Sequence, residues 1–248
     1  MLAMTLVATG LDAQAPLGTP IVVELFTSEG CSSCPPADAL LRRLVETEPA
    51  GARIIALGEH VDYWDRLGWK DRFSSAALTA RQQVYAAHFN NESIYTPQMV
   101  VDGRTQFVGS DAAAARRGID KAVASEHGRV TVALQSATGA TVPVSVKVLN
   151  LPSIARGDHA DILVAVTEDH LQSDVKAGEN RGRALAHTAV VRHLTTIGEV
   201  TGESGSAATD VTIAPDWKRD QLTVVAFVQQ RRGRAVLAAA AAPLVGRQ

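Results

Sequence analysis

The fold is decided by the stretch Ile21-Val22-Val23-Glu24-Leu25-Phe26-Thr27-Ser28-Glu29-Gly30-Cys31-Ser32-Ser33-Cys34. It starts with a β-branched and apolar run, typical of a buried strand, and then enters a turn at residues 27–30. After the cysteines, apolar residues recur at helical spacing over residues 37–48, and residues 53–57 supply another strand. The sequence therefore predicts a strand, a loop that carries both cysteines, a helix, and a second strand parallel to the first.

The two cysteines have the spacing that thiol–disulfide exchange needs. Two thiols on a turn before a helix can close and reopen a small disulfide with little backbone motion. Pro35 and Pro36 lack N–H donors and are tolerated only in the first helical turn, which places Cys34 near the first helical position. Unpaired backbone N–H groups and the helix dipole favour a thiolate there. We therefore expect Cys31 to be the nucleophile and Cys34 the resolving thiol.

Two other elements are candidates for the same site. Thr96-Pro97 precedes a strand and an Asp-Gly hairpin, and it resembles the cis-proline loop of the thioredoxin superfamily, which faces the cysteines and offers backbone to a bound peptide or thiol. By that resemblance we expect a cis bond. Glu24 resembles the buried acid of thioredoxins, with one more residue before the first cysteine. Either it takes the proton from Cys34, or it faces solvent or pairs with an arginine.

The rest of the chain divides into two parts. Residues 75–89 and 111–126 show helical patterns with a Ser or Asp cap, whereas the chain after Gly128 alternates with period two. The fold class predicted is an α/β thioredoxin-like domain at residues 20–128, followed by an all-β antiparallel sandwich domain at residues 129–248. Strands are expected near residues 130–134, 142–148, 161–166, 185–194, 222–228 and 235–239, and surface loops at residues 178–183 and 202–208.

Composition limits the partners. The chain has 248 residues, 46% hydrophobic and 20% charged, with a formal net charge of −2, which fits two soluble globular domains and no nucleic-acid surface. The basic run at residues 231–234 lies between two apolar stretches and is expected to form a solvated hairpin tip. No other cysteine is present, so no disulfide framework holds the fold together.

The first residues carry a compartment signal. Residues 2–10 are an apolar run that leads to Ala13-Gln14-Ala15, the small-x-small pattern cut by signal peptidase. This predicts that residues 1–19 are the remnant of a signal peptide and that the protein is periplasmic or secreted; the alternative is an N-terminal arm. No other run is long enough to span a bilayer, so we expect a protein that is not membrane-spanning.

A polar and aromatic loop at residues 60–71 contains four residues of metal-ligand type, His60, Asp62, Asp65 and Asp71. Their spacing matches no metal site that physical reasoning supports. We expect a structural lid over the cysteines in which Trp64 and Trp69 pack and the charges are solvated. No metal and no other cofactor is predicted.

Three segments together resemble one bacterial family. Residues 26–38, 61–65 and 95–103 are similar to a family of secreted proteins of unknown function that is thioredoxin-like in its N-terminal half. The resemblance covers nearly the whole chain and is weaker after Gly128. It implies fold and export, and it carries no established substrate.

The leading functional hypothesis is an exported thiol–disulfide oxidoreductase in which Thr96-Pro97 positions the partner, a protein or a small-molecule thiol or disulfide. One alternative is a non-catalytic envelope binding protein with a structural disulfide. Another is a soft-metal binder in which the cysteine thiolates act with His60.

Overall fold

The computed structural model describes residues 18–245, so the predicted signal segment lies almost wholly outside the described residues. The chain begins with the predicted unit of β1 (Thr19–Thr27), α1 (Pro35–Thr47) and β2 (Ala52–His60). β1 and β2 pair in parallel, from Thr19 opposite Ala52 to Thr27 opposite His60. The strand–helix–strand prediction is therefore confirmed.

The elements that follow also lie where the local patterns indicate. A short 3-10 helix, η1 (Asp65–Leu67), leads to α2 (Ala76–His88), whose cap residue Ser75 accepts a hydrogen bond from the Ala77 N–H at 3.2 Å. The hairpin of β3 and β4 and the last helix come next, with bounds Gln98–Val101, Thr105–Val108 and, for α3, Ala112–Val123.

The second half of the chain is formed by strands and one short 3-10 helix. The predicted strand at residues 185–194 is two strands, because the chain turns at Ala189, where φ is +49°. The predicted loop at residues 202–208 is wrong, since most of it belongs to a strand. The elements are β5 (Arg129–Leu134), β6 (Thr141–Leu149), β7 (Ala160–Glu168), β8 (Leu171–Asp174), β9 (Ala184–His187), β10 (Val190–Val200), β11 (Gly205–Thr212), η2 (Arg219–Gln221), β12 (Leu222–Gln230) and β13 (Val236–Pro243).

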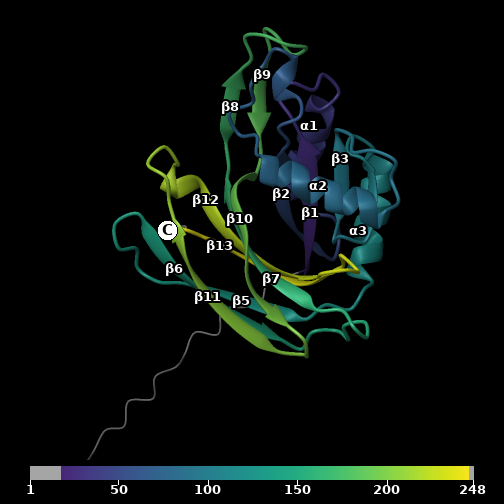
Figure 1. The fold of residues 1–248 in the computed structure, drawn as a ribbon, viewed down its shortest axis with the longest axis vertical. Helices are drawn as coiled ribbons and strands as arrows, with labels where there is room; N and C mark the ends of the chain where they lie inside the picture. The colour runs from purple at the N-terminus through teal and green to yellow at the C-terminus, as the bar shows by residue number, and fades with distance from the viewer. Residues whose placement is uncertain (1–17, 246–248) are drawn as a thin grey trace, which may run out of the picture.

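The predicted fold class, a thioredoxin-like α/β domain followed by a sandwich, is wrong. One mixed sheet of eight strands runs through both halves of the chain in the order β13-β12-β7-β10-β2-β1-β3-β4 (Figure 1). The halves join where β10 pairs in parallel with β2, at Val190 opposite Gly58. Period-two alternation identifies strands but not their partners, which explains the error. The division at residue 128 stays a prediction.

Side-chain packing follows the continuous sheet. α1 and α3 pack on β1, β2 and β3 in one cluster. A second cluster crosses the junction and contains Val22 and Leu57 from the first half together with Ala165 and Phe227 from the second. A small sheet, in the order β11-β6-β5, packs on the strands of the second half. β8 and β9 form a separate hairpin near α1 (Figure 1). The apolar core is therefore shared between the two halves.

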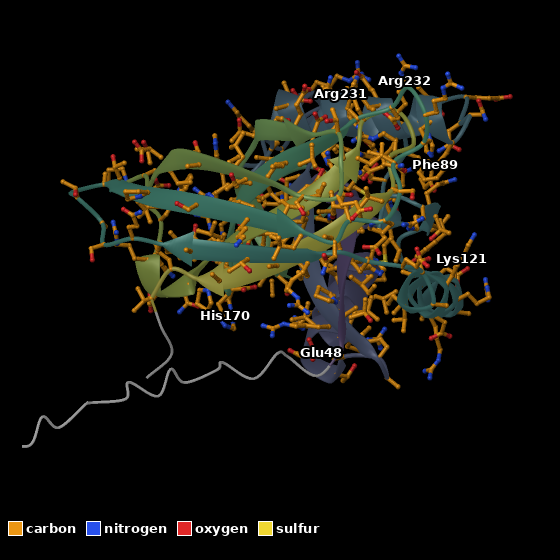
Figure 2. All side chains as sticks on the ribbon, turned by 90° about the horizontal axis from the view of Figure 1, so that it is seen from below. Glu48, Phe89, Lys121, His170, Arg231 and Arg232 are labelled. Atoms are coloured by element: carbon orange, nitrogen blue, oxygen red, sulfur yellow. A yellow bond between two sulfur atoms is a disulfide. The ribbon has the colours of Figure 1, made fainter. Side chains whose placement is uncertain are left out.

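The basic run is a hairpin tip, as predicted. It lies between β12 and β13, and Figure 2 shows Arg231 and Arg232 at the periphery of the molecule. Arg231 binds Asp161 at 2.6 Å and Glu199 at 2.8 Å, which ties the tip to β7 and β10. Among residues 18–245, no helix is long and apolar enough to cross a membrane.

Gly58 lies at the junction of β2 and β10, and a larger residue there should destabilise the protein. A Cβ at Gly58 would lie 2.8 Å from the carbonyl oxygen of Thr188, so Gly58→Ala must displace the backbone where β10 meets β2. We expect a loss of about 1–3 kcal/mol in the free energy of unfolding, measured by denaturant titration. Gly202→Ala is the matched control, because a Cβ there has nothing within 4 Å. Equal stability of the two variants would contradict the assigned junction.

Candidate functional site

The cysteine loop has the expected place, directly before α1. Cys31 and Cys34 form a disulfide with Cα atoms 5.4 Å apart, and Cys34 is the N-cap of α1 with Pro35 in the first helical position. The Cys34 N–H donates to the Cys31 carbonyl at 3.2 Å, and the Cys34 carbonyl accepts from the Ala37 N–H at 2.8 Å. Cys31 Sγ lies 3.3 Å from Ser33 Oγ. The structure thus holds an oxidised pair at the mouth of a helix.

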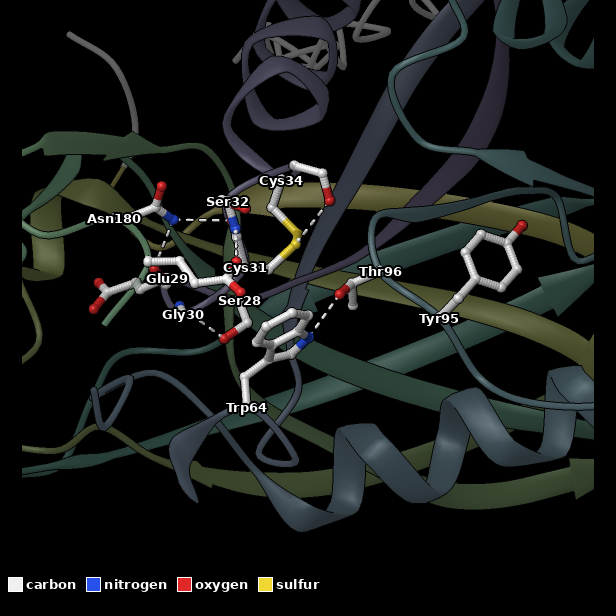
Figure 3. The surroundings of a disulfide bond; sticks show 12 residues. Ser28, Glu29, Gly30, Cys31, Ser32, Cys34, Trp64, Tyr95, Thr96 and Asn180 are labelled. Atoms are coloured by element: carbon white, nitrogen blue, oxygen red, sulfur yellow. Dashed lines mark hydrogen bonds between the residues drawn. A yellow bond between two sulfur atoms is a disulfide. The ribbon is translucent and has the colours of Figure 1, made fainter. Parts of the chain in front are cut away.

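Thr96-Pro97 lies beside this disulfide. The Thr96–Pro97 bond is cis, and Trp64 Nε1 donates to Thr96 Oγ1 at 2.7 Å. Figure 3 shows the Trp64 ring and Thr96 next to the sulfur atoms. A Cβ built at Gly109 would lie 3.1 Å from Pro97 Cβ and 3.2 Å from Ala37 Cβ, so the proline loop faces the start of α1. The predicted cis geometry is confirmed.

A segment from the second half of the chain binds the cysteine loop from another side. The Asn180 carboxamide, in the turn between β8 and β9, donates to the Glu29 carbonyl at 2.8 Å and to the Cys31 carbonyl at 2.9 Å (Figure 3). The Glu179 carboxylate accepts from the Ser32 N–H at 3.1 Å. Cys31 and Cys34 have no exposed surface. Sequence reasoning placed residues 178–183 in a surface loop and missed this contact.

The loop at residues 60–71 packs against the cysteine loop, but His60 and Asp71 are buried rather than solvated as predicted. Trp69 Nε1 donates to Glu29 Oε2 at 2.7 Å. His60 and Asp71 are both buried, with Nδ1 and Oδ2 2.6 Å apart, and a second Asp71 contact at 2.9 Å comes from the Glu29 N–H. Burying this His–Asp pair is possible because the two groups satisfy each other.

His60 and Asp71 belong to a larger cluster of ionisable groups beneath the loop. His187 on β9 lies 3.3 Å from Glu29, and its ring centroid is 4.9 Å from that of His60. Burial alone would lower the pKa of His60, but Asp71 raises it; burial alone would raise the pKa of Asp71, but His60 lowers it to about 2. The pair therefore favours an imidazolium and a carboxylate.

Asp38 lies one helical turn beyond Cys34, and its N–H donates to the Cys34 carbonyl at 3.1 Å. Burial raises the pKa of Asp38 to about 6, while the nearby His187 and His60 act in the opposite direction. Sequence reasoning did not single out this residue. Its position after the Pro35-Pro36 pair, on the first turn of a helix that starts at a cysteine, was the available signal.

Glu24 lies in a separate buried network and matches the arginine-paired alternative. Arg81 Nε lies 2.5 Å from Glu24 Oε2, and the Tyr85 hydroxyl also donates to Glu24. Burial tends to raise the pKa of Glu24, but Arg81 lowers it below its ordinary value. Glu59, 3.4 Å from Arg81, has a raised pKa because of burial and the neighbouring Glu24 charge. Glu24 is thus held as an anion by Arg81.

No metal site emerges from the described residues. Within residues 18–245, no three or more His, Cys, Asp and Glu side chains are arranged to hold a metal ion. His60 uses Nδ1 for Asp71, and its ring packs edge-on against Phe73 and His187.

Substitutions at Arg81 and Glu24 should lower the free energy of unfolding by different amounts. Arg81→Met leaves a buried carboxylate without a cation and should lower the free energy of unfolding by about 3–5 kcal/mol. Glu24→Gln should cost less, because Glu59 can ionise and pair with Arg81 in its place. Arg42→Met, in an exposed pair with Glu46, is the control and should change little. Denaturant titration measures all three, and a larger loss in Glu24→Gln than in Arg81→Met would contradict the pairing.

The raised pKa of Asp38 predicts that the stability of the protein depends on pH. A carboxyl whose pKa rises from 3.8 to about 6 on folding stabilises the protein below pH 3.8, and that contribution is lost as pH rises through 6. Wild type should therefore lose up to about 2 kcal/mol relative to Asp38→Asn between pH 4 and pH 7. Denaturant titrations across this range measure the difference. Asp38 is half-buried, and a difference that stays constant with pH would contradict its raised pKa.

Two solved structures are similar to this chain over most of its length. A protein of Agrobacterium tumefaciens, known from an X-ray crystal structure, is 26% identical with a TM-score of 0.71, and the match covers 94% of this chain and 98% of that chain. HBP35 of Porphyromonas gingivalis is 14% identical with a TM-score of 0.64, and the match covers 93% and 76%. At 14% identity, the second likeness shows a shared fold alone.

No curated protein matches the chain. A family model does: the family is described as a protein of unknown function (DUF1223), and its model matches residues 22–229. Since these residues include β2, both sides of the cysteine loop, the proline loop and the β8–β9 hairpin, the match extends over the whole candidate site. The chain belongs to the DUF1223 family of proteins of unknown function.

Proposed function

We propose that this protein is an exported thiol–disulfide oxidoreductase that acts through Cys31 and Cys34. The observation that supports it best is the disulfide at the N-terminus of α1, with Ser33 Oγ 3.3 Å from Cys31 Sγ and the Thr96-Pro97 loop beside it (Figure 3). A hydroxyl at that distance can donate to a Cys31 thiolate, and the helix terminus favours the same charge. Export rests on the apolar run at residues 2–10 and the small-x-small pattern after it.

The proposed reaction has two steps. In the reduced protein, the Cys31 thiolate attacks one sulfur of a disulfide, forms a mixed disulfide and releases the other sulfur as a thiolate that takes up a proton. Cys34 then loses its proton and attacks Cys31 Sγ, which closes the Cys31–Cys34 bond and releases the second thiol. Two electrons pass from the protein to the partner. In the opposite direction, the oxidised protein accepts two electrons from a dithiol.

Within this proposal, Asp38 is a better candidate than Glu24 to accept the proton of Cys34. Glu24 is paired with Arg81 and its pKa is lowered, which makes it a poor proton acceptor. Asp38 lies one helical turn from Cys34, and burial raises its pKa to about 6, nearer to the pH at which a general base works well. Thr96 and Pro97 are assigned to positioning the partner, which can be a protein or a small-molecule thiol or disulfide.

A second candidate function is supported by burial. Cys31 and Cys34 have no exposed surface, which favours a structural disulfide in a non-catalytic envelope binding protein. A soft-metal function of the thiolates with His60 has less support, because His60 is already paired with Asp71.

Redox titration of the cysteine pair separates the first two candidates. In dithiol and glutathione buffers, with alkylation and mass spectrometry as readout, an exchange enzyme should show a potential between roughly −120 and −270 mV. A structural disulfide should lie below about −300 mV. Cys34→Ala should trap mixed disulfides with a disulfide-bonded protein substrate, whereas Cys31→Ala is the matched control and should trap none. A potential below −300 mV without trapping would contradict the proposed function.

A further inference from the structure

The covering of the cysteine loop by the β8–β9 turn leads to an inference that rests on the proposed function. We propose that residues 176–183 form a clasp that closes over the cysteine loop, and that Asn180 is the positioning residue that holds it shut. Exchange then requires the clasp to open. The clasp is defined here by residues 176–183, between Val175 and β9.

The clasp is attached to the cysteine loop by few contacts. Asn180 is its only fully buried residue, and it bridges the carbonyls of Glu29 and Cys31. Arg183 donates to Asn180 Oδ1 at 3.1 Å, so Asn180 Nδ2 faces the two carbonyls. The Glu179 carboxylate at the Ser32 N–H adds one exposed contact. Gly178 of the clasp packs on Trp69 as well, because a Cβ built at this glycine would lie 3.1 Å from Trp69 Cβ. Breaking the contacts of Asn180 and Glu179 would release the backbone of the cysteine loop.

The clasp can move without disturbing the large sheet. Backbone hydrogen bonds join the two ends of the clasp. The Gly182 N–H donates to the Val175 carbonyl at 2.8 Å, and the Val175 N–H donates to the Arg183 carbonyl at 3.0 Å. β8 and β9 pair only with each other. His170 and Ala189, at the two ends of the hairpin, both have left-handed φ values, of +56° and +49°, where the chain turns sharply out of the sheet. The hairpin strands are therefore not paired with the large sheet, and side chains such as His187, which packs on His60 and Phe73, hold the base of the hairpin in place.

Closure explains why an exchange disulfide is buried. An incoming thiolate must approach a sulfur atom along the S–S direction, and neither cysteine exposes any surface in the closed state. Trp64 and Thr96 lie on one side of the disulfide, and Asn180 binds the cysteine loop from another (Figure 3). Asn180 comes from the separate hairpin, whereas Trp64 and Thr96 flank the large sheet. The clasp binds the backbone of the cysteine loop through the Glu29 and Cys31 carbonyls, so its opening gives access by releasing Cys31 to move away from Trp64 and Thr96.

The kinetics of reduction by dithiothreitol test the clasp in the full-length protein. Wild type should show a rate that reaches a plateau at high dithiothreitol concentration, because clasp opening becomes limiting. Asn180→Ala removes both bridging bonds and should react about five- to thirtyfold faster below the plateau. Glu179→Ala, on the exposed surface, should react about two- to threefold faster. The control Gln172→Ala changes an exposed residue of the same hairpin and should match wild type.

Denaturant titrations of the same variants show whether faster reduction follows from a lower global stability. The inference is overturned if wild type shows no plateau and Asn180→Ala reacts at the wild-type rate, or if the rates of all variants follow their free energies of global unfolding. Failure of the proposed function is a separate result, namely the absence of mixed disulfides in Cys34→Ala. Dithiothreitol reduces the disulfide without a physiological partner, so the clasp is tested whether or not Cys34→Ala traps mixed disulfides.

Discussion

The parallel pairing of β10 with β2 is the constraint on which the rest of the architecture depends. It joins strands from both halves of the chain into one sheet, at a position where Gly58 allows the backbone near Thr188 to approach closely. The β8–β9 hairpin immediately precedes β10, so this pairing also places the hairpin beside α1. Asn180 can reach the Cys31 carbonyl only because β10 enters the sheet next to β2. Fold and site are set by the same contact.

Buried charges stiffen the frame around the cysteine loop. Arg81 connects α2 to Glu24 on β1 and to Gln229 on β12, at 2.5 and 3.0 Å, so one guanidinium ties both halves of the chain together. The His60–Asp71 pair connects the end of β2 to the loop before α2. Such pairs contribute little net stability when complete, but removing one partner is costly. They hold the supports of the loop in one arrangement.

Much of the local structure could be predicted, because its signals lie within a few residues. The prolines after Cys34 fix the start of α1, and Ser75 caps α2 as its sequence context indicates. The fold class could not be predicted, because alternating strands carry no information about which strand lies beside which. The site was predicted only in part for the same reason. Asn180 is separated by 149 residues from Cys31, and Arg81 by 57 from Glu24, distances over which no local pattern acts.

The placement of the tryptophans has a practical consequence. Of the three indoles in the chain, Trp64 and Trp69 flank the cysteine loop, whereas Trp217 packs against Arg192 elsewhere. Gly178 of the clasp also packs on Trp69, since a Cβ at this glycine would lie 3.1 Å from Trp69 Cβ. The molecule therefore carries intrinsic fluorophores on both flanks of its cysteine loop, so a change in the surroundings of the loop would be reported by tryptophan emission without an attached dye.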